Sequence, residues 1–570
     1  MKNSYIADIF RGIAELLEIK GDNPFRIRAY LRAAENIDAL KYDIEEYASS
    51  NRLEDLPGVG KDLALKIDEI IGSGKCRHYE DLKKLVPEGV VRMLEIPSVG
   101  PKTAKLFFDS LKIRSVDELK EAALSGSLLG LPGIKQKTVY NILKGIELFK
   151  KGKERMDLLT ATSVSGSFID ELKNIKEVSK ILAAGSLRRM KETVKDIDIL
   201  VASKNPKKVS DAFIALPQVK RVLARGETKS SVLTNDDIQV DLRVLRPGSF
   251  GAALLYFTGS KNHNIRLRKQ AIKLRLKINE YGVFDKNDRR LSSNTEKEMY
   301  KALGLDYIEP QMREDSGEIE AALEHRLPLL LDLKDIRGDF HVHTDHSDGR
   351  GTIEEMAAEA VRLGYDYVCL ADHSGSLKVA RGLDRERLQG KKRELDKARA
   401  KLKNIKILFG SEVEIDSNGD LDYKDKDLSQ FDIVIAAIHS GFKQTKGQLT
   451  KRIVKACKNK YVHIIAHPTG RLWPTREPYE IDLKEIFKVA RETNTALEIN
   501  AQPYRLDLCD ASARLAKESG VRLAISTDSH DVRSMSYMKF GIGLAKRAWL
   551  ESRDVLNSLK TDALLKAIKK

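Results

Sequence analysis

The chain has few cysteines, and those it has lie far apart. Its 570 residues contain four, and no two of them have CxxC spacing. They are Cys76, Cys369, Cys457 and Cys509. This spacing argues against a disulfide scaffold and against a zinc ribbon, and scattered thiols are typical of a reducing compartment. We therefore expect a cytoplasmic protein.

The chain also lacks long apolar runs. No stretch approaches the roughly 20 residues that cross a bilayer, and the N-terminal MKNSYIADIFRG has no apolar signal core. We therefore expect no membrane association.

The chain carries an excess of positive charge, because it has 100 Lys and Arg against 84 Asp and Glu, a net charge of +16. This excess favours a polyanionic partner, and nucleic acid is the first candidate.

The most informative stretch is GSLRRMKETVKDIDIL, residues 185–200. Asp196 and Asp198 are two residues apart in a strand-like run, so we expect their side chains on one face. In a second run, IQVDLRVL, the alternation of apolar and polar residues places Asp241 on the polar face. If the two strands are neighbours, three carboxylates converge, and a divalent cation such as Mg²⁺ removes their repulsion.

A turn suited to phosphate precedes these carboxylates. Gly185 and Ser186 offer backbone N–H groups and a hydroxyl, and Arg188 and Arg189 supply positive charge. The turn and the carboxylates together indicate a two-metal phosphoryl-transfer site. For the Asp-x-Asp pair alone, the alternative is an ordinary solvated strand face.

Three glycine turns in the first quarter of the chain each lead into a basic amphipathic helix. They are LPGVGKDLALKIDEII (56–71), IPSVGPKTAKLFF (96–108) and LPGIKQKTVYNIL (131–143). A Gly-x-Gly turn between helices presents N–H groups to a phosphate and so binds DNA without reading its sequence. The residues expected at the DNA backbone are Gly58, Gly60, Lys61, Gly100 and Lys102. The third copy has Lys135 in place of its second glycine, so a structural role alone remains the alternative there.

Histidine is concentrated near the C-terminus, where eight of the 11 lie between His341 and His530. Seven short apolar runs alternate with helical patterns in this region, which predicts a parallel sheet. The runs are DFHVH, YDYVCLADH, IKILFGSEVE, DIVIAAIH, VHIIAHP, ALEIN and RLAISTDSH. Polar residues gather at the C-terminal ends of the runs, which predicts a barrel with its active site at that rim.

Nine groups at these ends are candidate metal ligands, more than one ion can use. They are His341, His343, Asp348, His373, Glu412, His439, His467, Asp528 and His530. We infer two or three ions, and mixed imidazole and carboxylate ligands suit zinc, manganese or iron better than calcium. Closely spaced ions activate water, so the predicted reaction class is phosphoester hydrolysis.

The strings GSLRR, DID, VDLR and LLYFTGS resemble the nucleotidyltransferase core of the DNA polymerase X family, over about residues 10–302. The resemblance implies that the three aspartates hold two Mg²⁺ ions and that Gly185, Ser186 and Arg189 bind the incoming triphosphate. It further implies contacts to the nucleotide or template from Tyr256, Phe257, Gly259, Asn264 and Arg268. Lys66 falls at the family's Schiff-base lysine. Three positions depart from the family pattern: Met190, Gln239 and Lys261.

The strings HVHTDHSDG, ADHS, GSEVEID, AIHS, AHP and STDSH resemble the PHP (polymerase and histidinol phosphatase) family, over about residues 336–567. This resemblance implies a distorted (β/α)7 barrel with a trinuclear centre, and all nine ligand positions are filled. His346 and His463 fall outside the pattern. Arg381 and Arg471 are candidates for binding the substrate phosphate.

We therefore expect a multidomain chain with a helical helix-hairpin-helix N-terminal region, an α+β nucleotidyltransferase palm and a C-terminal α/β PHP barrel. The predicted domains are a lyase-like helical domain (1–85), a fingers-like helical subdomain (86–150), the palm (151–250), a thumb-like nucleotide-selecting subdomain (251–315), a linker (316–335) and the PHP metallo-phosphoesterase (336–570).

The resemblances together imply a DNA-directed DNA polymerase that fills short gaps during base excision repair. The PHP barrel would add a 3′-to-5′ exonuclease that processes 3′ ends, with cleavage at abasic sites left open. The expected partners are gapped or nicked double-stranded DNA and deoxynucleoside triphosphates, with Mg²⁺ in the palm and two to three Mn²⁺ or Zn²⁺ ions in the barrel. We expect a monomer in the cytoplasm, associated with the nucleoid. Two alternatives stay open: an end-processing phosphoesterase in which templated synthesis is weak or lost, and a scaffold that binds DNA ends.

Overall fold

The computed structural model describes residues 2–38, 40, 44–56, 58–96 and 99–569, and the chain divides into two compact units. The first unit comprises Met1–Lys153 with Pro474–Arg476, and the second comprises Glu154–Trp473 with Glu477–Lys570. Pro57, Pro97 and Ser98, which belong to the predicted glycine turns, lie outside the described residues.

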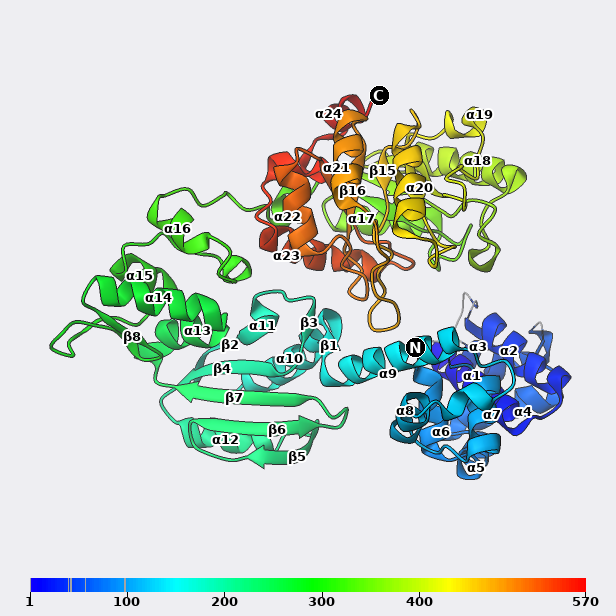
Figure 1. The fold of residues 1–570 in the computed structure, drawn as a ribbon, viewed down its shortest axis with the longest axis horizontal. Helices are drawn as coiled ribbons and strands as arrows, with labels where there is room; N and C mark the ends of the chain where they lie inside the picture. Colours follow the sequence, from blue (N-terminus) through cyan, green and yellow to red (C-terminus); the bar gives the residue numbers. More distant parts are fainter. Residues whose placement is uncertain (1, 39, 41–43, 57, 97–98, 570) are drawn as a thin grey trace. The chain divides into compact units, whose positions relative to one another are not determined.

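In its described residues, the first unit contains helices and no strand, and these helices share one apolar core (Figure 1). Its helices are α1 Lys2–Lys20, α2 Pro24–Asp38, α3 Ile44–Ser49, α4 Lys61–Ser73, α5 Arg77–Leu85, α6 Glu88–Arg92, α7 Pro101–Leu111, α8 Val116–Leu124 and α9 Gln136–Glu154. The apolar stripe of α1 is buried, as its helical spacing predicts, with Phe10 and Ile13 fully covered. The structure therefore packs the two predicted helical domains into one unit, and their boundary stays a prediction.

The palm is built on a mixed five-stranded sheet in the order β2-β4-β7-β6-β5 (Figure 1). The strands are β2 Val178–Ala183, β4 Ile197–Ser203, β5 Val219–Ala224, β6 Lys229–Thr234 and β7 Gln239–Leu245. Helices α10 Leu158–Leu172 and α12 Pro206–Ile214 pack on the sheet through Phe168 and Phe213, whose ring centroids are 5.4 Å apart. In β7 the predicted alternation holds, because Val240, Leu242 and Val244 are buried and the residues between them are half-buried.

A helical subdomain with a small three-stranded sheet follows the palm. Its elements are α13 Phe250–Thr258, α14 Lys261–Lys273, β8 Lys277–Asn279, β9 Gly282–Phe284, β10 Arg290–Ser292, α15 Glu296–Ala302 and α16 Glu318–Leu323. The stretch NIRLRKQAIKLRLKI, residues 264–278, predicts one continuous basic helix from its sequence, and that prediction was wrong at its C-terminal end. The helix stops at Lys273, and Arg275 adopts a left-handed φ of 59°. Leu276 and Ile278 then pack on the core of this subdomain, with Ile278 on a strand.

A short helix lies in the predicted linker, and it is packed rather than free. Ile319 and Ala322 of α16 are buried in the same core as α14 and α15. Glu318 is fully buried and its Oε1 lies 2.7 Å from Nδ1 of His263. Residues 318–323 are therefore part of this subdomain by packing.

A buried ion-pair group joins α11 (Gly185–Arg188) to α15. Nη2 of Arg188 donates to Glu296 Oε2 at 2.6 Å, and Nη1 of the fully buried Arg313 donates to Glu296 Oε1 at 2.6 Å. Burial alone would raise the pKa of Glu296, but the two arginines outweigh it and lower that pKa to about 2. Arg188, which the sequence suggested for phosphate, is therefore committed to Glu296.

We expect Glu296→Gln to lower the free energy of unfolding by about 3 kcal/mol or more, since two arginines lose their buried counter-charge. Because the folded pKa lies below the ordinary 4.5, the stabilisation is complete above that pH and is lost as the pH falls toward about 2. Urea unfolding at pH 7 measures the difference. Glu298→Gln, an exposed site on the same helix, is the control, and equal stability of the two variants would contradict the assignment.

The C-terminal part is a nearly closed barrel of seven parallel strands in sequence order, coloured green to red in Figure 1. The strands are β11 Gly338–Val342, β12 Tyr367–Leu370, β13 Lys406–Glu414, β14 Ile433–Ala437, β15 Ile464–Ile465, β16 Ala496–Asn500 and β17 Leu523–Ser526. Each of the seven predicted runs contains one of them. Hydrogen bonds between β11 and Ser529, just beyond β17, join the two edges: His343 N–H donates to Ser529 O at 2.8 Å.

Helices cover the outside of the barrel, as the alternating pattern predicts. They are α17 Ile353–Arg362, α18 Arg385–Lys401, α19 Asp425–Leu428, α20 Lys446–Lys458, α21 Leu483–Glu492, α22 Asp510–Glu518, α23 Met538–Arg547 and α24 Thr561–Ala567. Thr352 and Glu355 form a capping box at the start of α17, which fixes where that helix begins. The strands are buried on both faces, the usual state of a parallel sheet.

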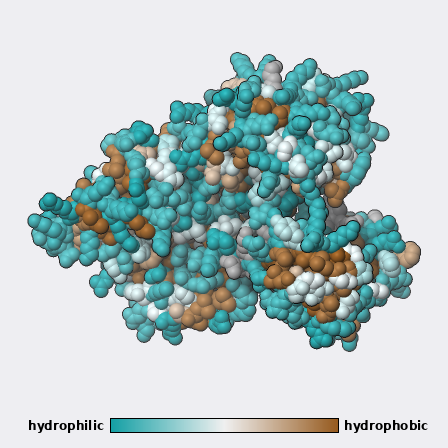
Figure 2. All heavy atoms as spheres, in the orientation of Figure 1, coloured by the Kyte–Doolittle hydropathy of each residue, from teal (hydrophilic) through white to brown (hydrophobic). Residues whose placement is uncertain are grey.

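On the face shown in Figure 2, hydrophilic residues predominate and apolar ones form local patches. None of the helices in the described part of the chain has the length and hydropathy needed to span a bilayer.

Candidate metal centres

The palm brings two of its three predicted aspartates side by side. Asp198 in β4 is the register partner of Asp241 in the adjacent parallel strand β7. Asp196 precedes β4 by one residue, so it is not on the strand as we predicted. Gln239, two residues before Asp241, donates from Nε2 to Asp241 Oδ1 at 3.0 Å. Asp196, Asp198 and Asp241 do not form a group in which all ligand atoms lie within 4.8 Å of one another, whereas residues of the barrel, described below, do.

The electrostatics of this group favour a cation. Burial, followed by the charges of Asp196 and Asp241, raises the pKa of Asp198 to about 7, against the opposing effect of Arg243 and Arg189. A buried carboxyl whose ionisation is opposed by two neighbouring carboxylates is a site whose charge a divalent ion would neutralise, and hard oxygen ligands suit Mg²⁺. The residues present therefore fit the predicted metal.

Position 185 requires glycine because its backbone lies close to the side chain of Asp198. It has a φ of 61°, and a Cβ at this position would lie 2.3 Å from Asp198 Oδ2. A side chain would therefore collide with the carboxylate as well as strain the backbone. The turn that begins here carries Ser186 and Arg189. Arg189 Nε donates to Glu314 Oε1 at 2.9 Å, and its Nη1 donates to Thr258 O at 2.5 Å.

The predicted nucleotide contacts lie together on α13 and α14. Tyr256, Asn264 and Arg268 line one small pocket with β8. The guanidinium of Arg268 lies 5.7 Å from the ring centroid of Tyr256, and Asn264 Nδ2 donates to Tyr256 O at 2.7 Å. Phe257 stacks under Arg243 of β7 at 4.1 Å, and Gly259 ends α13 with a φ of 67°.

The barrel rim gathers the nine predicted ligands around Glu412. Three clusters have ligand atoms within 4.8 Å of one another: His343, Asp348, His373 and His530; His341, His343 and Asp528; and His373, Glu412 and His439. Glu412 Oε2 lies 2.8 Å from His373 Nδ1, and Oε1 lies 2.9 Å from His467 Nε2. The two residues shared between clusters, His343 and His373, join them into one site. Three overlapping clusters are consistent with two to three ions.

Several of these ligand atoms are buried without a hydrogen-bond partner. They are His341 Nε2, His343 Nδ1 and Nε2, and His467 Nδ1. Buried polar atoms left unsatisfied are costly, and a bound cation would satisfy them. Burial, with His530 and His373 beside it, lowers the pKa of His343 to about 4, so this ring is neutral at pH 7. A neutral imidazole is the form that binds metal, so the donor set fits the predicted ions.

Sequence reasoning missed the carboxylates behind the histidines. The fully buried Glu498 of β16 lies 2.8 Å from Nδ1 of His341 through Oε1, and its Oε2 accepts from His467 N–H at 2.6 Å. Glu414 Oε2 lies 2.7 Å from His439 Nδ1. Such partners fix the orientation of metal-binding imidazoles. The available signal was the strand period, because Glu414 and Glu412 are two residues apart in β13.

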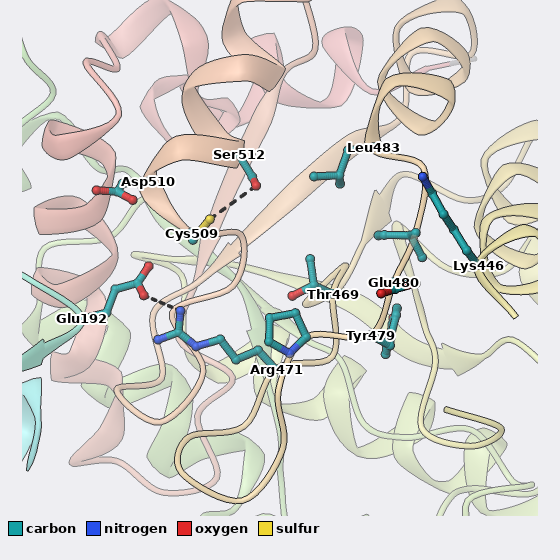
Figure 3. Close-up of a pocket in the computed structure, with 12 residues that line it drawn as sticks. Glu192, Lys446, Thr469, Arg471, Tyr479, Glu480, Leu483, Cys509, Asp510 and Ser512 are labelled. Carbon is teal, nitrogen blue, oxygen red and sulfur yellow. Dashed lines mark hydrogen bonds and ion pairs between the residues drawn. The ribbon is translucent and has the colours of Figure 1, made fainter. Parts of the chain in front are cut away.

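The remaining predicted site residues, two arginines for the substrate phosphate and one lysine for lyase chemistry, lie outside these two centres. Arg471 pairs with Glu192 of the palm, at the edge of a cavity of about 680 Å³ (Figure 3). Arg381 is exposed, in a turn with a φ of 52°. In the helical unit, Lys66 Nζ pairs with Asp62 Oδ1 at 2.5 Å, and a lyase role for this lysine stays a prediction.

Similarity to known proteins assigns this chain to a family. The DNA polymerase beta thumb model matches residues 253–314, and the PHP domain model matches residues 339–502. A helix-hairpin-helix domain matches residues 1–76, and a SAM-like helix-hairpin-helix tandem matches residues 90–147. The DNA polymerase/3′-5′ exonuclease PolX of Bacillus subtilis (strain 168) is 39% identical over 572 residues, which covers 99% of this chain and all of the relative. The chain belongs to the DNA polymerase X family.

The family assignment confirms the predicted enzyme class and fold. This X-family member is a DNA polymerase with a PHP domain and a 3′-to-5′ exonuclease activity. A probable phosphatase of Thermoanaerobacter sp. (strain X514) is 31% identical over 231 residues, 39% of this chain and 89% of the relative. A probable phosphatase of Caldanaerobacter subterraneus is 32% identical over 215 residues, 34% of this chain and 75% of the relative.

Proposed function

We propose that this X-family polymerase adds nucleotides to the 3′ ends of gapped DNA at Asp196, Asp198 and Asp241, and hydrolyses 3′ ends at the barrel rim. The observation that supports the first half most strongly is the register of β4 and β7, which places Asp198 opposite Asp241 beside the Gly185 turn. The second half is supported by the nine ligands, including Glu412, that gather in overlapping clusters at the barrel rim.

In the palm, Mg²⁺ ions would supply activation of the primer hydroxyl and neutralisation of charge on the transferred phosphate. The chain's own residues orient the reactants. Gln239 fixes the Asp241 carboxylate through its hydrogen bond, so this departure from the family pattern retains a supporting role. Ser186 and Arg189 bind the triphosphate. Tyr256, Phe257 and Gly259 line the sugar pocket, while Asn264 contacts the base edge and Arg268 contacts the template strand.

In the barrel, Mn²⁺ or Zn²⁺ ions would supply activation of water at neutral pH. Glu498 and Glu414 hold the imidazoles of His341 and His439 in a fixed orientation. The complete ligand set disfavours a barrel that is only a scaffold, since unused buried histidines and carboxylates would destabilise it.

Primer extension on a duplex with a one-nucleotide gap tests the proposed synthesis. We expect addition of the nucleotide complementary to the template base, and labelled 3′ ends that shorten when nucleotides are omitted. Shortening without any template-dependent addition would leave only the end-processing alternative.

The helical unit is proposed to bind the DNA backbone through its first two glycine turns. Gly60 and Gly100 cap α4 and α7 with almost the same backbone angles, φ −90° and ψ 175° against φ −91° and ψ 172°. Lys61 and Lys102 are exposed at the starts of these helices. The match of two separate turns is what a repeated phosphate-binding element requires.

Replacing Lys61 and Lys102 with alanine is expected to weaken DNA binding equally for all sequences. The slope of log affinity against log salt should fall by about 1 for each lysine lost. Fluorescence anisotropy over a salt series measures both effects. Lys137→Ala, at the equivalent position of the third turn, is the matched control, and an unchanged slope in the double variant would contradict the proposal.

We further propose that the protein acts as a monomer in the cytoplasm, on DNA of the nucleoid.

A further inference from the structure

Met190 follows the two arginines of the triphosphate turn, where the family pattern has glycine. It keeps a glycine-like backbone, with a φ of 54°. Its side chain packs against Gly543 of barrel helix α23: a Cβ on Gly543 would lie 2.6 Å from Met190 Cε and 3.0 Å from its Cβ. Because Gly543 has no side chain, Met190 of the palm can pack directly against the backbone of barrel helix α23 at this point.

Arg547, one helical turn beyond Gly543, contacts the same palm turn. Its side chain is 2% exposed. Nη1 donates to the backbone oxygen of Arg189 at 3.0 Å and to Glu314 Oε1 at 2.9 Å. Nη2 donates to Asp510 at the start of α22. A residue of the barrel thus binds the main chain of Arg189 directly.

Glu314 completes the link. The oxygen that accepts from Arg547 also accepts from Arg189 Nε at 2.9 Å. Burial would raise the pKa of Glu314, but Arg189, Arg547 and Lys191 outweigh it and lower that pKa, so the carboxylate stays charged. Arg189 is therefore held at two points. Its backbone oxygen accepts a hydrogen bond from Arg547 of the barrel, and its guanidinium pairs with Glu314, which Arg547 also binds.

We propose that Arg547 is a positioning residue for nucleotide addition: through Glu314 and the main chain of Arg189, barrel helix α23 fixes the triphosphate-binding turn of the palm. The inference rests on the proposed role of Arg189 in binding the triphosphate. The barrel then has a second task besides hydrolysis, because it preorganises the polymerase site. The Met190–Gly543 contact serves the same end by packing.

The test uses the full-length protein and a one-nucleotide gapped substrate. Arg547→Met keeps the length of the side chain and removes its hydrogen bonds. We expect it to raise KM for the nucleotide about tenfold, to change kcat less than threefold, and to leave the exonuclease rate within twofold. Arg547→Lys, which retains a charge but reaches fewer acceptors, should recover part of the loss. Lys539→Met, at an exposed position on the same helix, is the control.

Met190→Gly provides a variant that the backbone tolerates, since glycine readily adopts this φ. We expect a rise in KM of about threefold with an unchanged melting temperature. Because Met190 and Arg547 act on one turn, the effects of the two changes should not be additive.

Two results would overturn the inference. One is an unchanged KM in Arg547→Met and Met190→Gly. The other is a parallel fall of polymerase rate, exonuclease rate and melting temperature in both variants, which indicates a structural role only. Arg189→Ala separates the inference from the proposed function. If it raises KM while Arg547→Met does not, only the inference fails; if it leaves KM unchanged, the triphosphate assignment itself fails.

Discussion

Asp198→Asn is expected to lower nucleotide addition by about a thousandfold or more while 3′-to-5′ hydrolysis continues at its normal rate. The substitution keeps the shape of the side chain and removes one charged ligand from the group shared with Asp241. Electrostatic groups at a phosphoryl-transfer centre stabilise charge that develops during the reaction, and loss of one of them has effects of this size.

Both activities are measured on one gapped substrate with a labelled primer, with and without nucleotides. Asp236→Asn, at an exposed position between β6 and β7, is the matched control. Loss of both activities in Asp198→Asn would contradict the separation of the two centres.

The same substitution should stabilise the protein in the presence of a chelator. Because the pKa of Asp198 is raised from 3.8 to about 7, ionisation of this carboxyl opposes folding. The penalty is absent below about pH 4, grows as the pH rises to 7, and is complete above that pH. We expect Asp198→Asn to melt several degrees higher than the unmodified chain at pH 8, and the difference to shrink at pH 5. A lower melting temperature at pH 8 would show that the carboxylate is stabilising.

Glu412→Gln is expected to abolish hydrolysis and to release the metal ions of the barrel, while nucleotide addition persists. Glu412 lies within 4 Å of five histidines: His341, His343, His373, His439 and His467. Glutamine has nearly the same shape but no charge, so it binds cations weakly, and we expect a loss of about a thousandfold or more in rate.

Metal analysis of the purified protein and the exonuclease assay check this result together. His346→Gln is the matched control, because that histidine is close in sequence to the ligands but lies 3.2 Å from Glu394 instead. A Glu412→Gln protein with its full metal content and normal hydrolysis would contradict the proposed centre. With Asp198→Asn it forms a reciprocal pair, in which each substitution removes one activity and spares the other.

Local sequence patterns were enough to predict the barrel strands and most of the ligands at their ends. All seven predicted barrel runs contain a strand, and the clusters at the rim include eight of the nine predicted ligands, with His467 against Glu412. The reason is that a strand's period of two and the position of a ligand at its end are properties of a few consecutive residues. In a parallel barrel, all such ends meet at one rim, so a ligand set can be predicted without knowing any distance.

Contacts between distant residues were not available from local pattern. The end of α14 at Lys273 depended on Leu276 and Ile278 packing into a core, which overrode a continuous basic helical pattern. Glu498, 157 residues from His341, became its partner only through barrel closure.

By itself, the sequence determined the family, the alternation of strands and helices in the barrel, and the residue types gathered for two metal centres, because these are set by short periodic patterns and motifs. Only the tertiary structure decided that Arg188 belongs to Glu296, that Arg471 belongs to Glu192, and that Arg547 reaches the main chain of Arg189. Those pairings join segments up to 358 residues apart. No periodicity encodes them, since which charges meet depends on how the packed elements face one another in space.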